Sequence, residues 1–192
     1  MLKENYQTLN VPLATRLLIA CGAIGLRQVF RTGRGSVWGP ILLGIFGVAL
    51  IVAGVFVTDP GLGYPPGTHT SSPQTLHGAI HGVNAIPTFG SLAIAIFVLA
   101  RRFTGDPDWK GWALYSLITG ILFVGFFIAC LVVAQLDQSG VLPNSPAGLL
   151  ERVAIVIGWG WIALLAIRLL SQMRSPVSSA RPTKGTEVKT GS

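Results

Sequence analysis

The residues with the clearest chemical potential lie around one loop, between two apolar segments of the chain. Asp59 follows the first segment, His69 lies in the loop, and His77 and His81 open the next segment. Residues four apart share one face of an α-helix, so the last two histidines can act on one ligand. With Asp59 as a carboxylate partner, His77 and His81 form a candidate site for a divalent metal such as zinc.

A polar stripe continues from these histidines along the same segment. Asn84, Thr88 and Ser91 follow at spacings of three and four. Polar side chains within a membrane-crossing helix turn toward the protein interior rather than the lipid. Two charged residues also open the last apolar segment on the same side, so we predict a ligand pocket formed by Asp59, His77, His81, Asn84, Glu151 and Arg152.

A purely structural interpretation of the same residues stands beside the metal site. Histidines at a membrane boundary often hydrogen-bond to loop backbone, and Asp59 before Pro60 fits a turn that ends a helix. The tetrahedral ligand set that zinc prefers is incomplete. The metalloprotease signature, two histidines with an intervening glutamate, is absent from this sequence. No phosphate-binding loop ending in Gly-Lys-Ser or Gly-Lys-Thr is present either, which argues against nucleotide-driven transport by this chain.

The elements that position these residues are membrane-spanning helices. Of the 192 residues, 51% are hydrophobic and only 11% are charged, whereas soluble domains carry about a quarter charged residues. The apolar residues form blocks of about twenty, the length that crosses a bilayer as a helix. We therefore predict an all-α, polytopic transmembrane helix bundle within residues 1–174, with five spans at 11–30, 38–57, 77–100, 112–136 and 148–170.

The basic residues determine the predicted orientation of this bundle. Eleven of the 14 Lys and Arg residues lie in the connectors after the first and third spans or at and beyond the end of the fifth. By the positive-inside rule this side is cytoplasmic, which places the amino terminus outside and the carboxyl terminus inside a cell membrane. The net charge of +7 is thus a topology signal, and we expect the lipid bilayer rather than nucleic acid as partner. Residues 175–192 are too polar to form a core and are expected to be a disordered cytoplasmic tail.

Several motifs together resemble the bacterial and archaeal domain-of-unknown-function 998 membrane family. They are Gly54-Val-Phe-Val-Thr-Asp59-Pro60, Thr75-Leu-His77-Gly-Ala-Ile-His81, Arg101-Arg102, Trp112-Ala-Leu-Tyr115-Ser116 and Gly148-Leu-Leu-Glu-Arg152. The resemblance extends over about Val11 to Leu170 and implies a multispanning helical fold without an established activity. Members of that family usually have six helices, so we expect this chain to be short by one helix at its amino terminus.

Three classes of function remain open at this point. The first is a nonenzymatic protein whose outer pocket binds or moves a small polar ligand, a lipid headgroup or a proton. The second is a membrane-embedded lipid hydrolase in which Asp59, His77 and His81 hold a metal that activates water. The third is a scaffold whose polar stripe only packs helices. The sparse ligand set favours the nonenzymatic binding protein.

Overall fold

The computed structural model describes residues 22, 24–27, 29–60 and 74–174, which are mainly α-helical. The elements are α2 (Trp38–Val55), α3 (Leu76–Phe103), the short 3-10 helix η1 (Pro107–Trp109), α4 (Lys110–Gln138) and α5 (Ala147–Arg174). Residues 22, 24–27 and 29 are helical as well and precede α2. The described ranges contain no β-strand, so the all-α prediction is confirmed.

Four of these helices are long and apolar enough to cross a membrane. Even α2, the shortest with 18 residues, measures about 27 Å at a rise of about 1.5 Å per residue. They match the spans predicted at 38–57, 77–100, 112–136 and 148–170. Of the span predicted at 11–30, the structure describes only residues 22, 24–27, 29 and 30. The predicted tail 175–192 lies outside the described residues. The chain is a multispanning membrane protein.

The outward faces of the helices carry large aliphatic side chains. Val48 on α2, Ile121 on α4 and Val156 on α5 are between 57% and 71% exposed. A soluble protein rarely leaves so many such side chains on all sides of a bundle. They are the surface that lipid tails contact when the helices lie in a bilayer.

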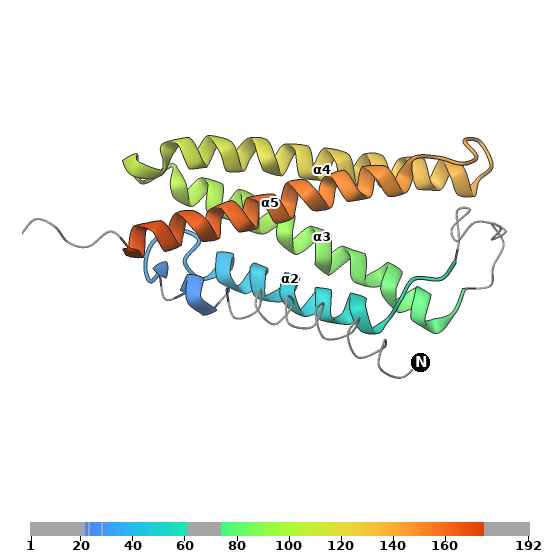
Figure 1. Cartoon of the computed structure of the whole chain (residues 1–192), viewed down its shortest axis with the longest axis horizontal. Helices are drawn as coiled ribbons and strands as arrows, with labels where there is room; N and C mark the ends of the chain where they lie inside the picture. Colours follow the sequence, from blue (N-terminus) through green and yellow to red (C-terminus); the bar gives the residue numbers. More distant parts are fainter. Residues whose placement is uncertain (1–21, 23, 28, 61–73, 175–192) are drawn as a thin grey trace, which may run out of the picture.

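The helices run back and forth along the long axis of the molecule and form two hairpins (Figure 1). The α2–α3 hairpin and the α4–α5 hairpin turn at the same end, which we call the acidic end because Asp59, Asp137 and Glu151 lie there. The connection from α3 to α4 lies at the opposite end, called the arginine end for Arg34, Arg101 and Arg102. Helix α3 packs on both α2 and α4, and α5 packs on α4.

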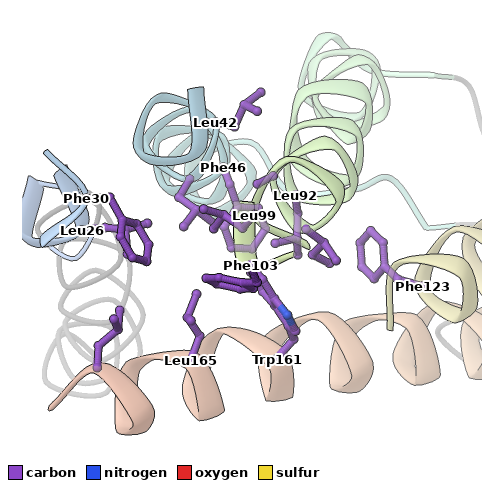
Figure 2. Packing of buried hydrophobic residues seen from close by; sticks show 14 of the residues in the cluster. Leu26, Phe30, Leu42, Phe46, Leu92, Leu99, Phe103, Phe123, Trp161 and Leu165 are labelled. Carbon is purple, nitrogen blue, oxygen red and sulfur yellow. The ribbon is translucent and has the colours of Figure 1, made fainter. Parts of the chain in front are cut away.

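A stripe on α3 forms the centre of the core. Leu92, Ile96, Leu99 and Phe103 follow at spacings of four, three and four, and each is at most 1% exposed. This spacing keeps them on one helix face. Phe46 of α2, Phe123 of α4 and Trp161 of α5 pack with this stripe in the same hydrophobic cluster (Figure 2).

One glycine and one hydrogen bond determine how closely α5 packs against the rest of the bundle. A Cβ atom on Gly158 would lie 2.8 Å from the ring of Phe123 and 2.9 Å from Leu92, so only glycine allows this contact. The indole Nε1 of Trp161 donates to the hydroxyl of Ser116 on α4 over 2.9 Å, and both residues are fully buried. Without this partner the buried N–H would be left unsatisfied, at a cost of about 1–3 kcal/mol.

Candidate functional site

A carboxylate holds the start of α3 at the acidic end. Asp59 accepts two hydrogen bonds from Thr75, one from the backbone N–H over 2.8 Å and one from the hydroxyl over 2.5 Å. Thr75 is the N-cap of α3, and its hydroxyl oxygen in turn accepts from the N–H of Gly78 over 3.1 Å. We call these contacts the Asp59 clasp. It joins the end of the α2 segment to the first turn of α3 and so fixes where α3 begins.

The clasp also changes the acidity of its carboxyl group. The Thr75 hydroxyl, followed by the Thr75 N–H, lowers the pKa of Asp59 from its ordinary value of 3.8, because both hydrogen bonds favour the ionised form. Partial burial opposes this change, and the neighbouring His77 adds a smaller lowering. Asp59 is therefore an anionic anchor for the helix rather than a proton donor near neutral pH.

The two histidines contact Phe56 in different ways. The ring of His77 lies 5.2 Å from the Phe56 ring, and His77 is exposed. The Nδ1 atom of His81 lies 2.7 Å from the Phe56 carbonyl oxygen. A carbonyl only accepts, so Nδ1 carries the proton, and in the neutral ring Nε2 is the atom that can accept. His81 thus ties α3 to the chain just beyond α2 and keeps one nitrogen for another partner.

A cavity of about 350 Å³ lies between the two hairpins, and His81 is one of its lining residues. We call it the hairpin cavity. Its polar lining comprises Thr58, His81, Asn84, Thr88 and Glu151. Its apolar lining comprises Phe46, Leu50, Ala53, Ala85, Phe89, Leu92, Phe123, Ile155 and Trp159.

Buried polar groups in the cavity wall bond to neighbouring helix backbone. Asn84, which is 8% exposed, donates from Nδ2 to the carbonyl oxygen of Ala49 on α2 over 2.8 Å. Thr88 donates its hydroxyl proton to the carbonyl oxygen of Asn84 over 2.7 Å. Ser91, one turn further, bonds likewise to Pro87. The predicted orientation of this stripe toward the bundle interior is confirmed, since all three side chains are buried.

Comparison with known proteins places the chain in a family. The family model described as a protein of unknown function (DUF998) matches residues 4–168. The chain belongs to the DUF998 family. No curated protein and no solved structure matches it.

The structure of this DUF998 protein divides the predicted pocket residues into three groups. His81, Asn84 and Glu151 line the hairpin cavity together. Asp59 and His77 lie at the clasp, beside the cavity. Arg152 is exposed, and its guanidinium lies 3.5 Å from the carbonyl oxygen of Gly148 one turn earlier. Glu151 and Arg152 diverge because consecutive helix residues point about 100° apart.

The metal-ligand prediction finds no complete set of ligands among the described residues. No group of three His, Cys, Asp or Glu side chains within 22–60 and 74–174, as far as these ranges are described, is placed to hold one ion. Both oxygens of the Asp59 carboxylate accept from Thr75. His69 lies outside the described residues.

Trp159 was not among the pocket residues predicted from the sequence. Trp159 lines the cavity and is 41% exposed, whereas Trp161 is the buried packing residue. A signal was present: Glu151, Ile155 and Trp159 are spaced by four, which places them along one face of α5. This stripe lines the cavity together with the polar residues His81, Asn84 and Thr88 of α3.

The substitution Gly78→Ala tests the clasp geometry. A Cβ atom on Gly78 would overlap the Asp59 carboxylate, so the variant is expected to melt a few degrees below the wild type. Gly82→Ala is the matched control, since a Cβ there meets nothing within 4 Å, and alanine favours a helix over glycine by about 1 kcal/mol. Size-exclusion chromatography of heated detergent samples measures both melting temperatures. Equal destabilisation by the two substitutions would contradict the geometry.

The lowered pKa of Asp59 predicts how the clasp responds to pH. A carboxyl whose pKa is lowered in the folded state stabilises that state fully above its ordinary pKa, and this stabilisation is lost as the pH falls through the folded value. At pH 7 we expect Asp59→Asn to melt a few degrees below the wild type. The difference should shrink once the pH is below the ordinary value of 3.8. A difference that stays constant from pH 7 to pH 3 would show that the charge is irrelevant.

Proposed function

We propose that this DUF998 protein binds an amphipathic molecule in the hairpin cavity, without catalysing a reaction on it. The observation that carries the proposal is the ordered lining of the cavity. His81, Thr58 and Glu151 lie toward the acidic end, whereas Leu92, Phe123 and Trp159 lie deeper between the helices. A ligand with one polar end and one apolar end matches such a site.

The dimensions of the cavity suit a single hydrocarbon chain. His81 and Leu92 line it eleven residues apart on α3, which corresponds to about 16 Å along the helix axis. This distance is about half of the roughly 30 Å hydrocarbon core of a bilayer. A chain of about twelve carbons with its head at His81 would therefore end near the middle of the bundle.

The hydrogen bonds of the wall favour a head group that donates. His81 donates from Nδ1 to Phe56, Asn84 donates from Nδ2 to Ala49, and Thr88 donates its hydroxyl proton to Asn84. The acceptor atoms that these bonds leave for a ligand include the Oδ1 of Asn84 and, with the ring proton on Nδ1, the Nε2 of His81, and the Glu151 carboxylate also accepts. We infer an ammonium or hydroxyl head, because the Glu151 carboxylate in the lining attracts an ammonium and repels a carboxylate or phosphate.

The orientation of the bundle completes the proposal. The basic residues of the arginine end favour the cytoplasmic side for that end. The hairpin cavity then opens toward the outer leaflet or the cell exterior, with the amino terminus outside. A metal-dependent hydrolase is less favoured, because both oxygens of the Asp59 carboxylate already accept hydrogen bonds from Thr75.

Filling the cavity tests the proposed function. Ala85 lines the cavity, and its neighbour Ile86 is 74% exposed on the outside of the same helix. We expect Ala85→Phe to weaken binding of radiolabelled dodecylamine to protein in phosphatidylcholine nanodiscs by about tenfold or more, a loss of about 1.4 kcal/mol. The matched Ile86→Phe should bind as the wild type does. Unchanged binding by an Ala85→Phe protein that melts normally would refute the cavity as the site.

A further inference from the structure

A second cavity lies at the arginine end, at the opposite end of the bundle from the polar lining of the hairpin cavity. It measures about 310 Å³, and its lining includes Arg34, Arg101 and Arg102 together with Phe30 and Trp109. We propose that this arginine cavity binds the phosphate group of an anionic lipid. The proposal does not depend on a ligand in the hairpin cavity, because the two cavities share no lining residue.

Arg102 is held in place before any ligand arrives. Its Nη1 donates to the carbonyl oxygens of Thr32 over 2.7 Å and of Arg34 over 3.0 Å. Its guanidinium carbon lies 4.2 Å from the centre of the Phe30 ring, a cation–π contact. A guanidinium has five N–H donors, so Arg102 keeps donors for a phosphate without having to be ordered by it.

The loop before α2 is shaped to wrap around this arginine. Gly33 and Gly35 have φ angles of +90° and +73°, which glycine adopts without strain. A Cβ on Gly33 would lie 3.3 Å from Nη1 of Arg102. The two glycines thus let the backbone carbonyls approach the guanidinium closely.

The charge of the lining matches an anion. Three arginines line the cavity, and the acidic residue among its lining, Asp106, accepts at Oδ1 from the N–H of Asp108 over 3.0 Å. The side chains of Arg34 and Arg101 are exposed and can reach a ligand in the cavity. Guanidinium groups bind phosphate oxygens through paired hydrogen bonds, which makes arginine the preferred residue for such groups.

The position of the cavity favours a lipid as the source of the phosphate. It lies where α3 ends and η1 begins, and Trp112 and Tyr115 follow within two turns on α4. Aromatic side chains of this kind concentrate at the headgroup level of a bilayer. Basic pockets between helices at the cytoplasmic boundary are well suited to anionic headgroups.

Titration with dioleoyl phosphatidylglycerol, followed by native mass spectrometry in an uncharged detergent, tests the proposal. We expect the wild type to prefer this lipid over dioleoyl phosphatidylcholine. The double variant Arg34→Gln/Arg101→Gln should bind phosphatidylglycerol about tenfold more weakly or worse, since it removes two of the three guanidinium groups that line the cavity. The matched Lys110→Gln/Arg152→Gln variant removes two charges outside the cavity and should stay within about twofold of the wild type.

Further measurements distinguish a lipid from free phosphate as the ligand, and a single variant replaces the double variant if that does not fold. Competition by inorganic phosphate would identify the phosphate group itself as sufficient, whereas binding that resists phosphate would assign the intact lipid. The single variant Arg101→Gln serves if the double variant does not fold. The proposal fails if a normally melting cavity variant binds phosphatidylglycerol as the wild type does, or if phosphatidylcholine binds equally well.

Discussion

The structure depends on how polar side chains inside the bundle satisfy their hydrogen bonds without water. Asn84 donates to the backbone of α2, Trp161 donates to Ser116 on α4, and His81 donates to the carbonyl of Phe56. Each bond joins α3 or α5 to another segment of the bundle, because an unsatisfied polar group in hydrocarbon costs several kcal/mol. Two of these bonds use donors of His81 and Asn84, so the acceptor atoms of these two side chains remain for a ligand in the hairpin cavity.

The two hairpins are closed by the same kind of contact. Asp59, beyond the end of α2, accepts from the backbone N–H of Thr75, the N-cap of α3. Asp137, in the last turn of α4, is buried and accepts from the N–H of Ser145 over 2.8 Å, two residues before α5 begins. In both hairpins an aspartate therefore orders the connection into the next helix. The hairpin cavity lies between these two closed units, so the clasps position its walls without lining it.

The two ends of the molecule then have opposite chemistry. At the acidic end, backbone carbonyls accept from His81 and Asn84, which leaves acceptors and Glu151 for a ligand. At the arginine end, backbone carbonyls accept from Arg102, which leaves guanidinium donors. A donating head group suits the first end and an anionic head group suits the second. The asymmetry agrees with the orientation that the positive-inside rule favours.

Sequence alone predicted the parts of this account that depend on local periodicity. Apolar blocks of span length gave the helices α2 to α5, and the spacing of Asn84, Thr88 and Ser91 gave a buried face. It could not predict that Thr75 occupies the Asp59 carboxylate, because that contact crosses a 16-residue separation. Nor did it separate Glu151 from Arg152, since their directions depend on how α5 is rotated against its neighbours. A cavity formed by four helices is a tertiary property, which explains why the cavity-lining role of Trp159 was missed.

The central claim is that the hairpin cavity holds the apolar chain of a ligand with a donating head. Photo-crosslinking with a primary alkylamine that carries a diazirine on its chain tests it most directly, with peptide mapping of the protein in nanodiscs. The account predicts that labelling concentrates on the cavity face of α3 and α5, at positions such as Phe89, Leu92 and Ile155, and falls when unlabelled dodecylamine is added. Labelling spread over lipid-facing positions such as Ile121 and Val132, and insensitive to the competitor, would contradict it.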